Sequence, residues 1–119
     1  MKGFKELQVW QKSIDLCVEI YKIAQILPKE ELYNLSSQLK RAAVSVPSNI
    51  AEGHERNSIK EYIQFLYISR GSLSELETQL YICNRLKFLS ADAIESPLLK
   101  ISEIGKMLNG LIKKLRPDT

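Results

Sequence analysis

Apolar residues recur along most of the chain at intervals of three and four, the spacing of one face of an α-helix. Between residues 7 and 27, two such stripes run side by side. They are Leu7, Trp10, Ile14, Cys17, Tyr21 and Ala24, and Val9, Leu16, Ile20, Ile23 and Leu27. Pro28 cannot continue a helix and disfavours helical angles at Leu27, so the first helix is predicted to end near Ile26.

The next segment repeats the pattern and contains a proline. Its apolar face is Leu32, Leu35, Leu39, Ala42, Val46, Ile50 and Gly53. Pro47 removes one backbone donor and crowds the carbonyl of Ala43, so a kink is predicted there, with Ser45 and Ser48 placed to satisfy the freed groups. Gly53 indicates the end of this second helix.

The third helix is predicted from Ile59 to about Lys87. Its apolar register is Ile59, Tyr62, Leu66, Ser69, Leu73, Leu76, Leu80 and Cys83. Ser58, followed three residues later by Glu61, is typical of a capping box. Gly71 in the middle of a helix costs about 1 kcal/mol relative to alanine, so we expect a close neighbour there.

A fourth helix follows Ser90 and ends before Pro117. It carries Ile94, Leu98, Ile101, Gly105, Leu108, Ile112 and Leu115. Pro97 is tolerated best in a first turn, so the regular helix is predicted to begin near Ser96. Short connections make successive helices antiparallel neighbours, which predicts an all-α, up-down-up-down four-helix bundle forming a single domain over residues 1–119.

The apolar pattern exceeds what one bundle can bury. The first helix has two stripes, and the third adds Phe65, Ile68, Ile82 and Leu86 outside its main register. Exposed apolar surface of this kind marks an interface, so we expect a homo-oligomer.

Composition agrees with long helices and leaves several functions open. The 119 residues include only 5 glycines and 4 prolines, and 45% are apolar. The formal net charge of +3 permits nucleic-acid binding without requiring it. Since no stretch approaches 18 uncharged apolar residues, we expect no membrane segment and a cytoplasmic location.

The potential metal ligands and nucleophiles are few. Cys17 and Cys83 are far apart, and His54 is the single histidine, which argues against a zinc site or a disulfide scaffold. A di-iron bundle would need two Glu-x-x-His motifs, which the sequence lacks. We interpret the cysteines as core residues and His54 as an exposed residue near a helix end, and we expect no metal and no cofactor.

Folding the second and third helices against each other about Asn57 aligns two polar rows. Arg41, Ser45 and Asn49 then lie near Ser69, Ser72, Glu75 and Glu77. The favoured interpretation is a satisfied buried network in which Arg41 pairs with Glu75 or Glu77, and the alternative is a catalytic or binding constellation. Because His54 is too distant to activate Ser45, no enzymatic activity is expected.

Basic residues gather at the bundle end that holds both termini and the turn near Asn57. They are Lys2, Lys5, Lys12, Arg56, Lys60, Lys113, Lys114 and Arg116. These side chains are candidate phosphate contacts, and an oligomer would present several copies of them. The alternative is a solvated helix end with favourably placed cations.

Three segments resemble a known family. They are residues 4–10, 38–53 and 71–77, whose motif positions are Arg41, Ser45, Pro47, Asn49, Glu52, Gly53, Gly71, Ser72, Glu75 and Glu77. The chain is similar to the four-helix-bundle proteins encoded in intervening sequences of bacterial 23S rRNA genes. That family is related to the accessory proteins of diversity-generating retroelements, which form pentameric barrels and bind nucleic acid and a reverse transcriptase.

The resemblance implies a homopentameric ring of four-helix bundles without enzymatic activity and with a role linked to RNA or DNA. It implies that the motif residues are architectural, because they fall on the seam between the second and third helices. The alternative function is a protein–protein adaptor, whose surplus apolar surface docks a partner such as a polymerase.

Overall fold

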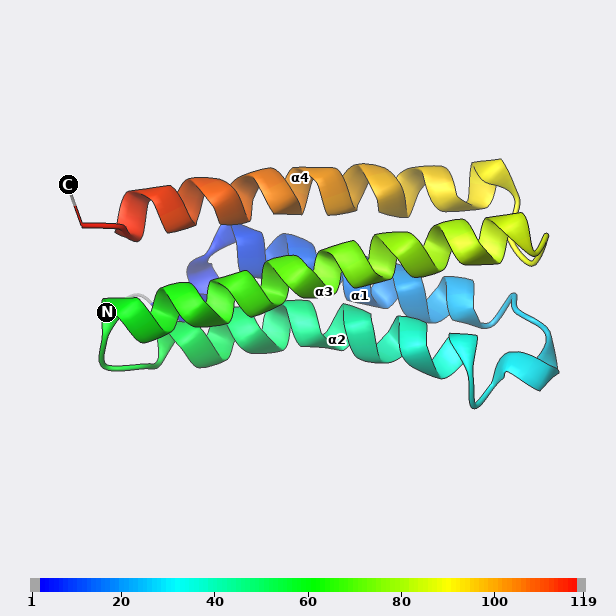
Figure 1. The fold of residues 1–119 in the computed structure, drawn as a ribbon, viewed down its shortest axis with the longest axis horizontal. Coiled ribbons are helices and arrows are strands. Elements are labelled where there is room, and N and C mark those ends of the chain that lie inside the picture. Colours follow the sequence, from blue (N-terminus) through cyan, green and yellow to red (C-terminus); the bar gives the residue numbers. More distant parts are fainter. Residues whose placement is uncertain (1–2, 118–119) are drawn as a thin grey trace.

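The computed structural model describes residues 3–117 and contains four long helices. They are α1 (Gln8–Ala24), α2 (Leu35–His54), α3 (Ile59–Arg85) and α4 (Ala91–Leu115), with 3-10 turns η1 (Phe4–Glu6) and η2 (Lys29–Glu31). Successive helices run antiparallel along a body measuring 47 × 23 × 20 Å (Figure 1). The predicted all-α four-helix bundle is therefore confirmed.

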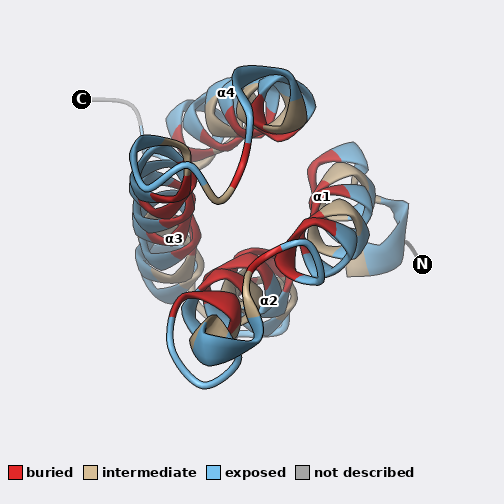
Figure 2. Ribbon diagram, turned by 90° about the vertical axis from the view of Figure 1, so that its right-hand side faces the viewer, coloured by how far each residue is buried: buried red, intermediate tan, exposed pale blue. Residues whose placement is uncertain are grey.

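Each helix turns one buried face toward the centre of the bundle (Figure 2). On α1, the buried face is the second stripe of the sequence pattern, with Leu16 and Ile20 completely enclosed. The first stripe, except for buried Ala24, borders solvent, and its members Ile14 and Tyr21 are exposed. The prediction that apolar residues remain on the surface is confirmed for Ile68 and Ile82 on α3 and for Leu86 directly after it, whereas Phe65 is half-buried.

The second helix begins later than the sequence pattern predicts. Leu32 and Tyr33 precede it and are 50% and 92% exposed. The turn η2, which follows Pro28, instead brings the Glu31 carboxylate to the start of α2, where it accepts a hydrogen bond from the Leu35 amide at 3.3 Å. The helix therefore starts at Leu35, because a side chain from the preceding turn caps it there.

The prediction that the fourth helix begins near Ser96 is wrong. The helix starts at Ala91, and the Ser90 hydroxyl caps it by accepting a hydrogen bond from the Ala93 amide at 3.1 Å. Pro97 lies inside the helix and is completely buried. Its ring deprives the Ala93 carbonyl of a helical partner, and burial of the ring in the core offsets that cost.

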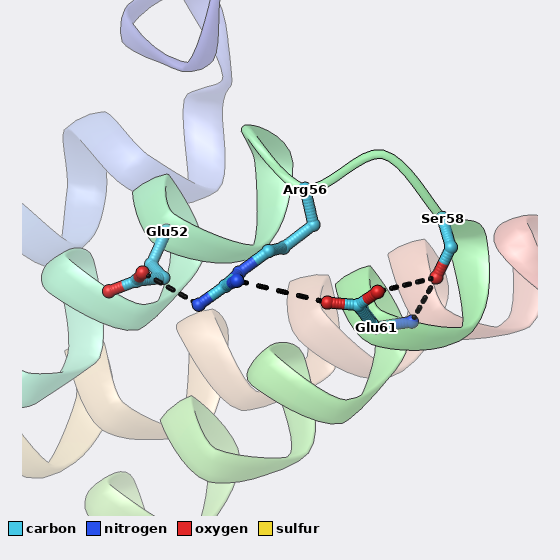
Figure 3. A network of polar contacts seen from close by, with 4 residues as sticks. All are labelled: Glu52, Arg56, Ser58 and Glu61. Atoms are coloured by element: carbon cyan, nitrogen blue, oxygen red, sulfur yellow. Dashed lines mark hydrogen bonds and ion pairs between the residues drawn. The ribbon is translucent and has the colours of Figure 1, made fainter.

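The predicted cap of α3 at Ser58 is confirmed, but the second half of a capping box is not formed, because the Glu61 carboxylate contacts the Ser58 hydroxyl and not the Ser58 amide (Figure 3). The Glu61 amide donates to the Ser58 hydroxyl at 3.0 Å, and that hydroxyl lies 3.4 Å from the Glu61 carboxylate. Arg56 extends between the carboxylates of Glu52, at 3.0 Å, and Glu61, at 3.8 Å. These contacts tie the end of α2 to the first turn of α3.

The polar rows predicted between α2 and α3 do meet. The hydroxyls of Ser45 and Ser72 lie 2.8 Å apart, and the Asn49 amide donates to the Ser45 hydroxyl at 2.9 Å. Buried Ser69 donates to the Val46 carbonyl at 2.9 Å, next to Pro47. The helix α2 continues through buried Pro47 from Leu35 to His54, and the bend at this proline stays a prediction.

The expected buried pairing of Arg41 is wrong. Arg41, Glu75 and Glu77 are all exposed, and Arg41 makes no ion pair with any residue in the described range 3–117. Arg41 and Glu75 instead line an open hollow of about 400 Å³ on the outside of the seam. Buried Ala42 follows Arg41, and one residue turns a helix by 100°, so the arginine side chain emerges beside the seam.

The close approach expected at Gly71 occurs at Gly53 instead. A Cβ on Gly53 would lie 2.7 Å from the Phe65 Cβ and 3.2 Å from the Tyr62 carbonyl. Gly71 is exposed, and a Cβ there would meet nothing within 4 Å. Gly53 is therefore the glycine that lets α2 and α3 pack closely.

The burial of the two cysteines and of the single histidine depends on how the helices pack. Cys83 is buried as predicted, Cys17 is half-buried, and burial raises the pKa of both thiols. His54 is not exposed as predicted: it is half-buried, with ring centroids 6.4 Å from Phe4 and 5.7 Å from Tyr62. The turn η1 supplies Phe4, a contact that helical periodicity does not reveal.

Gly53→Ala is expected to destabilise the fold by about 1–3 kcal/mol, because the added methyl group overpacks against Phe65. Gly71→Ala is the matched control and should stabilise a single chain by about 1 kcal/mol, since it adds helix propensity at an open position. Urea unfolding followed by fluorescence of Trp10, the only tryptophan, measures both. Equal effects of the two substitutions would contradict the assignment.

Arg41→Ala should change the free energy of unfolding by less than about 1 kcal/mol, because the guanidinium is exposed and makes no ion pair with the described residues. Thermal melts by circular dichroism measure the change. A loss of about 3–5 kcal/mol would instead indicate that the arginine is part of a buried charge pair.

Candidate nucleic-acid interface

On α3 and on α4, the residues that face the other helix recur at intervals of three and four, which places them on one side of each helix. Two side-chain contacts fix this pairing. The Arg70 guanidinium donates to the Asn109 side-chain oxygen at 2.9 Å, and the Arg116 guanidinium donates to the Tyr67 hydroxyl. These contacts connect the amino-terminal half of α3 to the carboxyl-terminal half of α4.

Basic residues accompany these contacts along both helices. On α3, Lys60 and Arg70 share a side with Tyr67, and on α4, Lys106 and Lys113 share a side with Asn109 and Arg116. We define the α3–α4 basic stripe as Lys60, Arg70, Lys106, Lys113 and Arg116. All of these cations are exposed. Lys60 and Arg70 are ten residues apart on α3, a length of about 15 Å, and Arg116 directly follows the end of α4.

Tyr67 lies at the middle of the stripe, between two guanidinium groups. The Arg70 guanidinium is 4.7 Å from the centre of the tyrosine ring, and that of Arg116 is 6.0 Å away. Attraction between the Arg70 guanidinium and the ring face, together with the hydrogen bond from Arg116 to the hydroxyl, holds the three side chains together. An aromatic ring among arginines is an arrangement that nucleic-acid-binding surfaces use.

Two hollows flank this tyrosine. The first, which we call the α3–α4 groove, has a volume of about 530 Å³ and is lined by Ile59, Lys60, Ile63, Gln64, Tyr67, Leu115 and Pro117. The second has a volume of about 290 Å³, and its charged lining residues are Arg70, Glu77 and Lys106. Glu77 is the only carboxylate among the described residues that line either hollow, so the surface is cationic overall.

Ion pairs neutralise two of the cations that were predicted from the sequence to contact phosphates. Lys12 lies 3.3 Å from the Glu103 carboxylate, and Arg56 is held by Glu52 and Glu61. Lys2 lies outside the described residues. These ion pairs reduce the positive charge at the bundle end where the basic residues were predicted to gather.

The structure brings together only part of the predicted basic set. Lys60, Lys113 and Arg116 lie on the α3–α4 basic stripe. Lys5 is exposed on η1, which packs beside α1 and α2, and Lys114 is turned by 100° from Lys113 around α4. The cationic surface therefore follows one side of the bundle rather than covering one end.

Arg70 and Lys106 belong to this surface but were not predicted. Both lie in the middle of their helices, so sorting charges by bundle end did not include them. The available signal was positional: residues 60, 63, 67 and 70 repeat at intervals of three and four, as do residues 106, 109, 113 and 116. Aligning these two rows on antiparallel neighbours would have predicted the stripe.

The motif residues lie mainly away from the stripe. Ser45, Asn49 and Ser72 form the seam network, and Pro47 and Gly53 are buried beside it. Glu52 holds Arg56 at the turn, whereas Arg41, Gly71 and Glu75 are exposed near the seam. Glu77, which lines the smaller hollow, is the motif residue that reaches the stripe.

Metal binding requires clustered ligand side chains, and membrane spanning requires a long apolar helix. Within residues 3–117, no three histidine, cysteine, aspartate or glutamate side chains gather closely enough to hold a metal ion. None of the helices in the same range is both long enough and apolar enough to cross a membrane.

A four-helix bundle with one cationic side is the class of protein that the fold and surface define. The chain belongs to the 23S rRNA-intervening sequence protein family, whose model matches residues 5–110. A solved structure from the S23 ribosomal protein family of Bacteroides thetaiotaomicron, described as having unknown function, is 27% identical with a TM-score of 0.82. It covers 88% of this chain and 98% of its own. No curated protein matches the chain.

Proposed function

We propose that the protein is a non-enzymatic, oligomeric bundle that binds RNA or DNA through the α3–α4 basic stripe. The observation that carries the proposal is the concentration of five exposed cations around Tyr67, where Glu77 is the single carboxylate among the described residues that line the two hollows along the stripe. Phosphate groups are the ligands that such a surface attracts, and arginine binds them through paired hydrogen bonds.

The modest net charge of the chain does not oppose this proposal. The formal charge of +3 is an average over the surface, whereas binding depends on the local field. Most acidic partners of the basic residues lie elsewhere: Glu103 and Glu19 pair with lysines between α1 and α4, and Glu52 pairs with Arg56 at the turn. The stripe is thus left with little neutralising charge. The family name associates these proteins with 23S rRNA genes, which favours RNA as the first ligand to test.

For a single-stranded oligonucleotide just long enough to cover one stripe, binding should weaken as salt increases. Five phosphate contacts give a slope of log K against log salt no steeper than about −3.5, since each contact contributes about 0.7. Fluorescence anisotropy over a salt series measures the slope. Absence of binding to any RNA or DNA at low salt would refute the proposed function.

A matched pair of charge reversals tests the location. Lys106→Glu with Lys113→Glu should remove binding, whereas Lys29→Glu with Arg85→Glu should change it little. Both variants have the same net charge, and all four positions are exposed. Equal losses in the two variants would mean that overall charge, rather than the stripe, governs the interaction.

We also propose that the chains assemble into a homopentamer. An apolar patch on α1 and α2, formed by Ile14, Val18, Tyr21 and Val44, supports self-association. Part of it lines a groove of about 470 Å³. The pair α1 and α2, which carries the patch, lies across the bundle from the pair α3 and α4, which carries the stripe (Figure 2). The number five comes from the family resemblance.

Val18→Glu should dissociate the oligomer, because it places a charge in the centre of the apolar patch. Leu99→Glu is the control, since Leu99 is 68% exposed on α4, outside the patch. Light scattering coupled to size-exclusion chromatography should give five times 13.6 kDa for the unmodified protein and for the control. A single 13.6 kDa particle at micromolar concentration would refute the assembly.

A second candidate function is a protein–protein adaptor. It is favoured by the groove between α1 and α2, which is lined mainly by Cys17, Val18, Tyr21 and Val44. In this case the groove docks a polymerase-like protein rather than another copy of the chain. Reversal of Lys106 and Lys113 would then leave partner binding intact, whereas Val18→Glu would remove it.

A further inference from the structure

We propose that the α3–α4 groove holds an unpaired nucleobase while the basic stripe binds the neighbouring phosphates, so that the protein selects single strands over duplexes. This inference rests on the proposed function and specifies its ligand. It depends on the apolar groove and the cations being adjacent on the same pair of helices.

The lining of the groove suits the face of a base. Ile59, Ile63, Leu115 and Pro117 provide aliphatic surface, and Ile59 is 51% exposed to water although it is apolar. The volume of about 530 Å³ is within the range of small-molecule pockets. Covering this surface with the flat face of a base removes apolar area from water on both partners.

Besides Tyr67, two polar side chains line the groove, those of Gln64 and Lys60. Gln64 supplies an amide with both donor and acceptor, which matches the edges of unpaired bases. Lys60 also lines the groove and brings a positive charge to it. A base therefore finds stacking surface, one hydrogen-bonding amide and a cation for the adjoining phosphate.

Tyr67 connects the groove to the stripe. Its ring lines the groove, and its hydroxyl accepts the hydrogen bond from Arg116. The guanidinium of Arg116 has further donors, so it binds a phosphate while keeping the tyrosine in place. Arg70 on the same ring extends the phosphate path toward Lys106. Base and phosphate sites thus share one fixed aromatic side chain.

Charge distinguishes this occupant from two others. A fatty acid would fill the groove, but its one carboxylate would neutralise only one of Lys60, Lys113 and Arg116. The α1–α2 patch of a second copy would bring Lys22 and Lys40 toward these cations, since Lys22 lines that groove and Lys40 lies over Tyr21. A polyanion with a flat apolar group at each phosphate satisfies both parts of the surface.

A base within a duplex cannot enter the groove without leaving its stack. Unstacking and unpairing cost a few kcal/mol, which a single-stranded base avoids. Phosphates of a duplex still reach the stripe. The protein should therefore bind duplexes in a salt-dependent manner and bind single strands more tightly.

The test compares three oligonucleotides of equal length by fluorescence anisotropy at one salt concentration. They are a single-stranded RNA, the same sugar–phosphate strand with abasic residues, and a duplex RNA. We expect the abasic strand and the duplex to bind about 10-fold more weakly than the intact strand, which corresponds to the stacking of one base. Equal affinity for intact and abasic strands would overturn the inference while leaving the proposed function in place. No binding of any strand at low salt would refute both.

Variants locate the effect in the groove. Ile59→Ser should weaken binding of the intact strand to the level of the abasic strand, and Gln64→Ala, at an exposed position, should produce a smaller loss in the same direction. Leu99→Ser should preserve the 10-fold difference. Circular dichroism confirms that each variant is folded, and the Gln64 variant serves if Ile59→Ser unfolds. If Ile59→Ser changes the mass of the assembly but not the preference for intact strands, the groove is a subunit contact and the inference is wrong.

Discussion

The close approach of α2 and α3 is the constraint on which the remaining structure depends. Gly53 allows it, because its missing side chain leaves room for Phe65 and for the backbone at Tyr62. Hydroxyl groups of Ser45, Ser69 and Ser72 fill the rest of the seam with short hydrogen bonds. These small side chains fix the register of the two helices, since shifting either one would bring larger residues into the contact.

The long third helix transmits this constraint to the α3–α4 basic stripe. One side of α3 carries Ser69 and Ser72 toward α2, and another carries Tyr67 and Arg70 toward α4. Once the seam has set the rotation of α3, the positions of the tyrosine and the arginine are set as well. Residues that make no contact with a ligand thereby determine where the cations stand.

The sequence predicted the elements of the fold well, and it predicted the details that depend on helix rotation less well. Apolar spacing was sufficient for four helices, and local chemistry was sufficient for the cap at Ser58. Aligning the helices about Asn57 brought the two polar rows together, but it could not show that Arg41 emerges beside the seam, because one residue changes the direction of a side chain by 100°. Likewise, Gly53 and Gly71 are alike in sequence, and only packing separates them.

Part of the candidate site could not be predicted from the sequence, because it also depends on the rotation of the helices. Sorting charge along the bundle axis found Lys60, Lys113 and Arg116, whereas Arg70 and Lys106 become neighbours of these residues only when charge is sorted around the axis. Sorting charge around the axis requires knowing which sides of α3 and α4 meet, and the side-chain contacts of Tyr67 and Asn109 show which sides these are. Packing of α4 around Pro97 also lay beyond periodicity, since propensity alone disfavours a proline there.

The positions of Arg116 and Pro117 determine where a tag can be attached without disturbing the basic stripe. Arg116 bonds to Tyr67, and Pro117 lines the adjoining groove, so an affinity tag inserted directly after Pro117 would begin next to the surface being assayed. Its histidines would introduce additional charge and bulk there. The turn η1, in contrast, packs beside α1 and α2 on the other side of the bundle. Purification handles and fluorophores therefore belong near η1, away from Arg116 and Pro117.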